Sequence, residues 1–199
     1  MLSPEVSDFS AWRLMYDVNK LVILEGCNIC GREEDSIVLP KEVQLLLISG
    51  CDDVRNISNI PTFNTLERLE ILYVQALSNL SGILLNVSES SPADLYSHLK
   101  FVRIFRCNKL KKLISSKLIS ELKNLEQIDV KDCTEMEELI AVDDEDDNEE
   151  RSQKEFLLPK LKRLSLDNVP KLKSICSCNG VMVMNCICLL IGDQTPSKI

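Results

Sequence analysis

Histidine, aromatic residues and long apolar runs are scarce in this 199-residue chain. The single histidine, His98, lies just before a predicted strand, and no serine or cysteine nucleophile has an obvious partner base near it in the pattern, which argues against hydrolase chemistry. No Gly-x-x-x-x-Gly-Lys-Ser/Thr segment occurs, so the sequence contains no phosphate-binding loop of its own. We therefore expect no enzyme activity and no cofactor.

The net charge, the longest apolar run and the N-terminal residues limit the kinds of partner that we expect. The net charge is −8, and the lysine-rich stretch at 109–117 has no interleaved aromatic residues, so a nucleic-acid surface is not expected. The longest apolar run, 181–191, is interrupted by Asn185 and is shorter than the roughly 20 residues that span a bilayer. Residues 1–5 lack the composition of a secretory signal. We expect a cytoplasmic protein with no nucleic-acid, membrane or small-molecule partner.

What the sequence does contain is an internal repeat. Its clearest copy runs Leu125-x-x-Ile128-x-Val130-x-x-Cys133-x-x-Met136-x-x-Leu139, which is the line of a leucine-rich repeat. Five further copies are read as Leu161, Leu164, Leu166, Val169, Leu172, Ile175; Leu99, Val102, Ile104, Cys107, Leu110, Leu113; Leu66, Leu69, Ile71, Val74, Leu77, Leu80; Val43, Leu46, Ile48, Cys51, Val54, Ile57; and a degenerate Val22, Leu24, Cys27, Cys30. Such a period predicts a solenoid in which each repeat packs on its neighbours.

The pattern within each copy predicts the local structure. Apolar residues alternate over a few positions, as in Leu164-Ser165-Leu166, which is the period of a half-buried strand. Beyond the strand the apolar spacing becomes three, which indicates a loop or a short helical turn. The predicted fold class is an α/β solenoid: a leucine-rich-repeat horseshoe with a parallel sheet on the concave face and loops or short helical turns on the convex face.

The spacing of the repeats locates two insertions. With the position of Cys51 as the reference, successive copies lie 24, 23, 33, 26 and 36 residues apart. The two long intervals contain 88–97, which is rich in serine, and 143–154, which is strongly acidic; both are expected to be exposed loops.

Three segments follow from this organisation. Residues 1–17 are predicted to be an N-terminal cap or linker, 18–178 an irregular leucine-rich-repeat domain of about six repeats, and 179–199 a non-repeat C-terminal tail. A cap is expected because the end of a solenoid exposes a sheet edge and apolar surface. Phe9, Trp12 and Leu14 are the residues that would fold over the first repeat.

The nine cysteines do not predict a metal site. Cys27, Cys51, Cys107 and Cys133 share one repeat position, which Val74 and Val169 also fill in this reading, and valine cannot bind zinc. The pairs Cys176-x-Cys178 and Cys186-x-Cys188 do not match the usual gap between zinc ligands, so structural thiols are favoured over a metal site there. The acidic run 143–147 lacks the glycine and the spaced glutamate of an EF-hand loop. No metal is expected.

Alternation also assigns the concave face. Its predicted positions are Phe101, Arg103 and Phe105 in one repeat, Gln127, Asp129 and Lys131 in the next, and Arg163, Ser165 and Asp167 in the last. Exposed aromatic residues and arginines dominate protein interfaces. The candidate protein-binding residues are therefore Phe101, Arg103, Phe105, Gln127, Lys131 and Arg163.

Three segments carry a resemblance to a known family. The sequences at 156–164 and 170–176, with 133–140 followed by an acidic insertion, resemble the C-terminal repeats of plant coiled-coil, nucleotide-binding, leucine-rich-repeat disease-resistance proteins. The resemblance covers roughly residues 18–178. It implies an intracellular protein-interaction module of innate immunity.

In that family the repeats sense pathogen effectors or modified host proteins and restrain a nucleotide-binding switch domain. The resemblance thus implies a protein partner: an effector, a guarded host protein or the nucleotide-binding domain of a receptor. The sequence departs from the family in lacking the coiled-coil and nucleotide-binding segments, and the repeat register stops after Cys178. The alternative is a substrate-recruiting adaptor of a ubiquitin ligase, for which the segment 6–17 is too short to be a ligase-binding domain.

Overall fold

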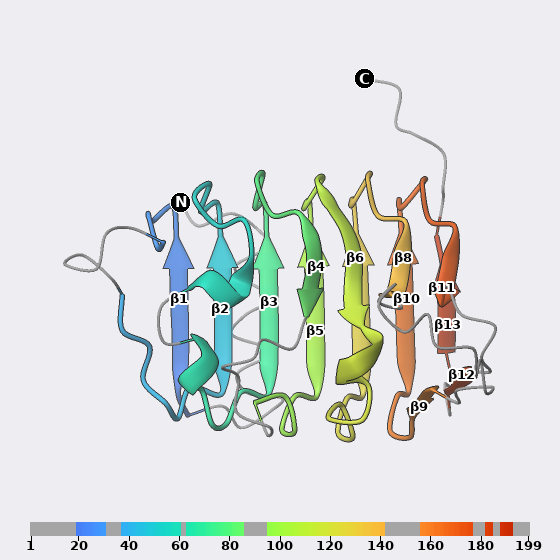
Figure 1. Ribbon diagram of the computed structural model, residues 1–199, viewed down its shortest axis with the longest axis horizontal. Coiled ribbons are helices and arrows are strands. Elements are labelled where there is room, and N and C mark those ends of the chain that lie inside the picture. Colours follow the sequence, from blue (N-terminus) through green and yellow to red (C-terminus); the bar gives the residue numbers. More distant parts are fainter. Residues whose placement is uncertain are drawn as a thin grey trace, which may run out of the picture.

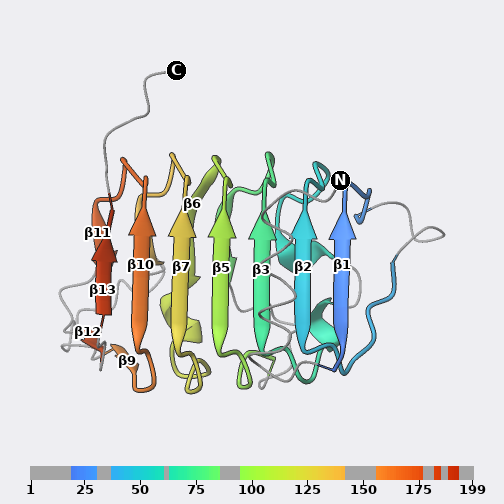
Figure 2. The same cartoon turned by 180° about the vertical axis from the view of Figure 1, so that it is seen from behind.

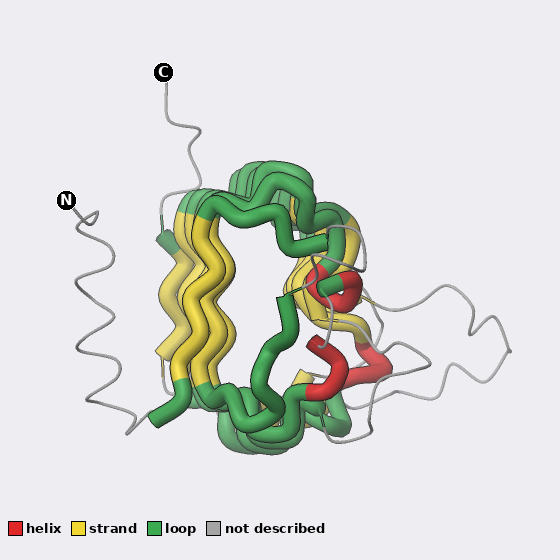
Figure 3. Tube along the Cα trace, turned by 90° about the vertical axis from the view of Figure 1, so that its left-hand side faces the viewer, coloured by secondary structure: helices red, strands yellow, loops and turns green. Residues whose placement is uncertain are grey.

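The computed structural model describes residues 19–30, 37–60, 63–85, 95–141, 156–176, 182–184 and 188–192. These residues form a solenoid in which two parallel sheets lie on opposite sides of the winding and turns connect them (Figure 3). The winding stacks one repeat beside the next along a single direction (Figure 1). The predicted leucine-rich-repeat solenoid with a parallel sheet is confirmed.

The large sheet has seven strands, and each of its neighbouring pairs is parallel (Figure 2). In spatial order they are β1 (Leu21–Glu25), β2 (Leu45–Ser49), β3 (Ile71–Gln75), β5 (Phe101–Phe105), β7 (Gln127–Lys131), β10 (Arg163–Asp167) and β13 (Cys188–Ile191). The order follows the sequence, as expected when each repeat adds one strand.

The return path contains more strand than the sequence indicated. A second parallel sheet runs there in the order β11-β8-β6-β4, and β9 pairs with β12 in a small third sheet. The bounds are β4 (Gly82–Leu85), β6 (Leu110–Ser115), β8 (Glu138–Ala141), β9 (Phe156–Leu158), β11 (Ser174–Cys176) and β12 (Met182–Met184). The expected helical turns are the 3₁₀ helices η2 (Ile57–Asn59), η3 (Phe63–Thr65) and η4 (Ser116–Leu118). Strands occur because stacked copies of an extended return segment can pair with one another.

The main core lies between the two sheets. Inward residues such as Leu46, Leu72 and Ile128 have no solvent exposure, and leucines of the turns and the return path, such as Leu77 and Leu113, pack against them. Burying one such side chain stabilises the fold by about 1.5–3 kcal/mol. Because every repeat supplies the same apolar positions, the core is continuous along the solenoid.

One backbone conformation repeats at the end of each strand. Gly26, Gly50, Ala76, Arg106, Asp132 and Asn168 follow β1, β2, β3, β5, β7 and β10 directly, and all have φ between 50° and 60°. After β1, β2, β3, β5 and β7, the N–H of this left-handed residue donates to the carbonyl of the last residue in the next strand of the large sheet. For example, the Ala76 N–H donates to the Phe105 carbonyl at 2.8 Å. The left-handed residue therefore turns the chain out of the sheet while its N–H still joins the neighbouring repeat.

This column of left-handed residues corrects one copy of the sequence repeat. Pairing of β3 with β2 and β5 places Leu72 and Val74 on the core positions, and Leu77 takes the place that Cys51 and Cys107 fill. The register assigned to Leu66–Leu80 was therefore wrong by three residues, and Val74 does not share the cysteine position. The true intervals are 24, 26, 30, 26 and 36 residues.

Parts of the predicted domain organisation fall outside the described residues. These are 1–17, the insertion 143–154 and most of 88–97, so the cap and the insertions stay predictions. Of the predicted tail 179–199, the described residues are those of β12 and β13 and Gly192. No helix among the described residues is long and apolar enough to cross a membrane.

Candidate functional site

The candidate site lies on the outer face, which we define as the side of the large sheet turned away from the main core. Strand register arranges its residues in three rows running from β1 to β10. They are Leu21, Leu45, Ile71, Phe101, Gln127, Arg163; Ile23, Leu47, Tyr73, Arg103, Asp129, Ser165; and Glu25, Ser49, Gln75, Phe105, Lys131, Asp167. All six candidate residues predicted from the sequence are thus brought together on β5, β7 and β10.

Apart from Glu25, Ser49 and Gln75 at the ends of β1, β2 and β3, the residues of the outer face form two chemically different groups, which we call the apolar half and the polar half. The apolar half consists of Leu21, Ile23, Leu45, Leu47, Ile71, Tyr73 and Phe101. The polar half consists of Arg103, Phe105, Gln127, Asp129, Lys131, Arg163, Ser165 and Asp167. The change from one half to the other occurs across β5, which contributes to both.

The two candidate phenylalanines are not exposed, contrary to the sequence expectation. Phe101 has 3% of its surface accessible and belongs to the apolar half, and Phe105 has 7% accessible. The guanidinium of Arg106 lies 4.5 Å from the centre of the Phe105 ring and covers part of it. Similarly, the guanidinium of Arg103 lies 5.5 Å from the ring of Tyr73. The cations, rather than the rings, are the outermost groups at these positions.

Asp129 lies at the centre of the polar half, between the strands that carry Arg103 and Arg163. Register pairs it with Arg103 on β5 and with Ser165 on β10. Burial raises the pKa of its carboxyl, while a hydrogen bond from Gln127 Nε2 to Oδ2 at 2.9 Å and the charges of Arg163 and Arg103 act in the opposite direction. In the described part of the chain Oδ1 has no hydrogen-bond partner. A buried acceptor without a hydrogen bond lowers the stability of the fold, and a donor on a bound partner would remove this penalty.

Two exposed cations flank this carboxylate. Lys131 and Arg163 are both exposed, and Lys131 Nζ lies 3.0 Å from Asp167 Oδ2. Sequence reasoning placed Asp129 on the face but did not select it as a site residue. The signal that would have found it is an acidic position flanked, in the same row of adjacent repeats, by a basic residue such as Arg103.

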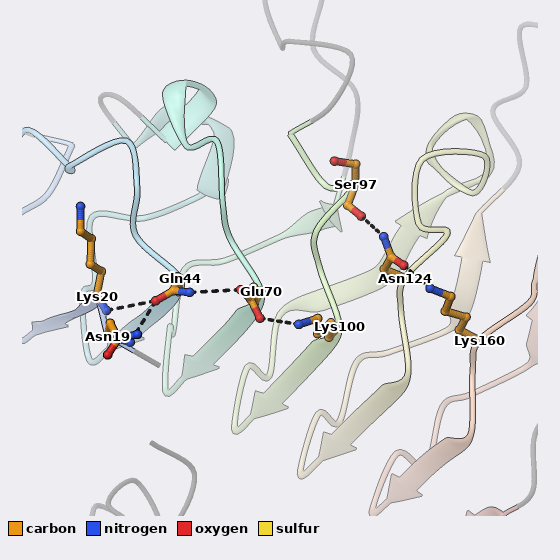
Figure 4. A network of polar contacts seen from close by, with 8 residues as sticks. All are labelled: Asn19, Lys20, Gln44, Glu70, Ser97, Lys100, Asn124 and Lys160. Atoms are coloured by element: carbon orange, nitrogen blue, oxygen red, sulfur yellow. Dashed lines mark hydrogen bonds and ion pairs between the residues drawn. The ribbon is translucent and has the colours of Figure 1, made fainter. Parts of the chain in front are cut away.

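A polar ladder borders the site along the edge where the strands begin (Figure 4). Gln44 Nε2 donates to Glu70 Oε1 at 3.2 Å, and Lys100 Nζ donates to Glu70 Oε2 at 2.6 Å. Lys162 Nζ donates to Glu126 Oε2 at 2.7 Å further along the edge. Exposed ion pairs contribute about 0–1 kcal/mol each. These side chains pair with one another across neighbouring repeats, so the ladder holds the repeats in register. Its charges are already paired, which is why we look for the site in the polar half.

A second column of contacts lies beside this ladder. Asn124 Nδ2 donates to the Ser97 carbonyl at 2.6 Å, and Lys160 Nζ donates to Asn124 Oδ1 at 2.6 Å (Figure 4). These bonds join three successive repeats through one side chain. The edge next to β5, β7 and β10 is therefore held in a fixed arrangement.

The cysteines form a buried structural column. Cys51, Cys107 and Cys133 have no exposure, and the Sγ atoms of Cys107 and Cys133 point at the carbonyls of Phe105 and Lys131, at 3.6 and 3.5 Å. Burial raises the pKa of Cys107 to about 11 and that of Cys133 to about 12. Thiols that stay protonated are poor ligands and nucleophiles.

No group of three or more His, Cys, Asp or Glu residues that could hold a metal ion occurs in the described part of the chain. The side chains of the C-terminal Cys-x-Cys pairs lie outside that part. The polar half consists mainly of charged and amide groups on three neighbouring parallel strands.

Comparison with known proteins identifies the repeats. A family profile described as "Plant disease resistance protein RPS2-like, leucine-rich repeats" matches residues 78–189. A relative from Arabidopsis thaliana, "Probable disease resistance protein At4g27220", is 28% identical over 177 residues, covering 81% of this chain and 17% of the relative. No solved structure matches.

The chain thus spans about a sixth of the length of this relative, as the 17% coverage shows. The matched residues extend from the turn after β3 into β13, and so include β5, β7 and β10 with the whole polar half. The resemblance to plant disease-resistance proteins, which we inferred from the sequence of the repeats, is confirmed. The chain belongs to the leucine-rich-repeat family of RPS2-like plant disease resistance proteins.

Proposed function

We propose that this chain is the protein-recognition part of a disease-resistance protein, and that it binds a pathogen effector or a host protein through the polar half of the outer face. The observation that carries the proposal is Asp129, whose Oδ1 lacks a hydrogen-bond partner among the described residues. Leaving such a group unsatisfied costs about 1–3 kcal/mol. A donor on the partner, such as a lysine, an arginine or a backbone N–H, would satisfy it on binding.

The surrounding residues supply complementary contacts. Arg163 and Lys131 are exposed and offer charge-assisted hydrogen bonds to acidic groups of a partner. Gln127 is half-buried and donates a hydrogen bond to Asp129, and Arg103 is half-buried on the neighbouring strand, where its charge acts on Asp129. Phe101 and Phe105 lie on the same face but are buried, so their rings are not offered to a partner. A partner with alternating basic and acidic groups fits best.

The size of the polar half sets its role in an interface. Three strands of five residues cover a flat area of roughly 10 by 17 Å, or about 170 Å². A stable protein interface buries about 800 Å² per partner. The polar half is therefore the centre of a larger contact, to which the bordering ladder and adjoining loops contribute.

The thiols of the described residues support a cytoplasmic location for this proposed function. Cys27, Cys30, Cys51, Cys107 and Cys133 are free cysteines. Reduced cysteines are typical of the cytosol, whereas secreted proteins form disulfides. We place the recognition event in the cytoplasm, and we assign the chain a binding role and no catalysis.

The proposal is tested by capture from plant extracts with matched variants. The site variant is Lys131→Glu with Arg163→Glu, both exposed in the polar half. The control is Lys111→Glu with Lys123→Glu, both exposed outside the outer face and equal in charge change. We expect proteins retained by the wild-type chain and the control to be lost from the site variant. Retention of the same proteins by all three chains would contradict the proposal.

A further inference from the structure

Three thiols lie close together in the first two repeats, at the end of the large sheet where β1 lies (Figure 2). Cys27 and Cys51 each lie two residues after the end of their strands, β1 and β2. Cys30 follows Cys27 in a Cys-x-x-Cys spacing, and both pack against the main core. Burial is the main cause that raises the pKa values of Cys30 and Cys51, and each also feels another thiol of this group, Cys51 in the first case and Cys27 in the second.

Strand register sets the separation of Cys27 and Cys51. β1 and β2 pair in parallel along their whole length, and the Gly26 N–H continues the pairing by donating to the Ser49 carbonyl at 2.9 Å. Gly26 and Gly50 share a φ of 60°, so both chains turn in the same way just before the cysteines. Neighbouring strands lie about 4.8 Å apart, and a disulfide joins Cα atoms that are roughly 4.4–6.8 Å apart. The backbones of Cys27 and Cys51 are therefore at a separation that suits a disulfide.

The two thiol groups are directed at the same stretch of β1. Cys27 Sγ lies 3.1 Å from the carbonyl oxygen of Glu25, and Cys51 Sγ lies 3.7 Å from the carbonyl oxygen of Leu24 in the preceding repeat. Cys51 thus reaches back toward the repeat that carries Cys27. Rotation of the two side chains between staggered rotamers is the movement that brings the sulfur atoms together.

Accessibility separates these residues from the second adjacent pair of the cysteine column. Cys27 is half-buried, whereas Cys107 and Cys133 have no exposure. An oxidant dissolved in water reaches Cys27 in the folded protein, but it reaches the second pair only after local unfolding. β1 is also the first strand of the large sheet, and a repeat at the end of a solenoid packs on one neighbour and opens more easily than an interior repeat.

Cys30 is the other thiol that could pair with Cys27. Its backbone N–H donates to Asp53 Oδ2 at 2.5 Å, which ties the turn after β1 to the turn after β2. The register that aligns Cys27 with Cys51 aligns Cys30 with Val54, which is fully buried. We therefore favour Cys51 as the partner of Cys27, and valine is a suitable replacement for Cys30.

We propose that Cys27 and Cys51 form a reversible disulfide on exposure to hydrogen peroxide, and that this bond covalently joins the first repeat to the second. The Cys27 thiolate attacks one oxygen of the peroxide, the O–O bond breaks, and Cys27 becomes a sulfenic acid while the departing hydroxide takes up the thiol proton as water. The Cys51 sulfur then attacks the Cys27 sulfur. The S–S bond forms, the S–O bond breaks, and the departing hydroxide leaves with the Cys51 proton as a second water.

The two thiols lose two electrons in this reaction, and the peroxide is reduced to two molecules of water. Two equivalents of a small thiol reverse the bond by exchange. Disulfides of this transient kind are the ones that occur in the cytosol. Because β1 and β2 lie toward the opposite end of the large sheet from the polar half, the disulfide does not rest on the proposed partner site.

Peptide mapping tests the pairing. The reduced 199-residue protein is treated with a few equivalents of hydrogen peroxide, unfolded with iodoacetamide present to block the remaining thiols, and digested with trypsin without reductant. Cleavage after lysine and arginine puts Cys27 and Cys30 in peptide 21–32 and Cys51 in peptide 42–55. We expect these two peptides to be linked after peroxide treatment, and to separate on reduction. Cys107 and Cys133 should remain blocked thiols.

Two valine variants identify the bonded thiols. The link should persist in Cys30→Val and disappear in Cys51→Val, in which valine takes a position that Val169 fills in the repeat of β10. A disulfide within peptide 21–32, a link that is lost from Cys30→Val, or no link at all would overturn the proposal. Oxidation of Cys107 and Cys133 to the same extent would overturn it too, because accessibility would then not select the pair.

Hydrogen exchange tests the consequence for the fold. In the oxidised protein the amides of β1 should exchange about tenfold more slowly or better than in the reduced protein, since the bond opposes opening of the end repeat. The amides of β7 should be unchanged, and Cys51→Val should show no effect of peroxide on β1. Equal exchange of β1 in the reduced and the disulfide-bonded protein would contradict the joining of the two repeats.

Discussion

Raising the pH should destabilise this protein through two buried thiols. Cys107 and Cys133 are fully buried in the turns after β5 and β7, and burial is the main cause that raises their pKa values from 9.0 to about 11 and about 12. In the unfolded chain both thiols ionise near the ordinary value. Their contribution to stability is therefore complete below pH 9 and is lost as the pH rises through the folded-state values, because the unfolded chain alone gains the thiolate.

The magnitude follows from the size of these shifts. One pH unit beyond the unfolded pKa costs about 1.36 kcal/mol for each group that stays protonated in the fold. Between pH 8 and pH 10 each thiol thus removes about 1.3 kcal/mol, and the pair about 2.5 kcal/mol. That is a large share of the stability of a protein of this size, which is on the order of 5–15 kcal/mol.

The assay compares urea unfolding at pH 8 and pH 10 for the wild-type chain and for Cys107→Val with Cys133→Val, in the presence of a reductant. Valine fits this position, because Val169 fills it in the repeat of β10 and is fully buried. Other titrating groups, such as Tyr96, whose pKa burial also raises, are common to both chains and cancel in the difference. An equal loss of stability in the two chains would refute the reasoning about the buried thiols.

Two further predictions concern the repeat itself. Gly50→Ala should lower the free energy of unfolding by about 1 kcal/mol, since Gly50 has φ of 60° and a Cβ there is strained; urea unfolding measures it, and Ala76 with φ of 50° shows that the fold survives such a residue. Ile128→Ala, which empties a fully buried site in the middle of β7, should cost about 3 kcal/mol and lower the melting temperature in calorimetry. An unchanged melting temperature would mean that Ile128 is not in the core.

The sequence predicted the solenoid and the strands because the offsets of the repeat and the alternation within each strand agree in most copies. They disagree at 66–80. Apolar residues there occupy two registers three residues apart, since outward positions such as Ile71 are as hydrophobic as inward ones such as Leu72. The alternation that normally separates the two faces is lost in β2 and β3. The column of left-handed residues, visible in the backbone alone, resolves the register.

The candidate site could be predicted in position but not in exposure. Alternation correctly placed Phe101 and Phe105 on the outer face. Their burial depends on Arg106 and on the neighbouring apolar residues, which a single strand does not reveal. The importance of Asp129 depends on arginines that lie 26 residues before it and 34 after it in sequence, and irregular intervals hide that proximity.

The most direct test of the account is the affinity of the captured partner for the wild-type chain and for the variant Lys131→Glu with Arg163→Glu, measured by isothermal titration calorimetry. Loss of two contacts at the centre of an interface, each worth roughly 1–2 kcal/mol, predicts a dissociation constant higher by about 30- to 1,000-fold. The control Lys111→Glu with Lys123→Glu should keep the wild-type value. Equal dissociation constants for all three chains would contradict recognition through the polar half of the outer face.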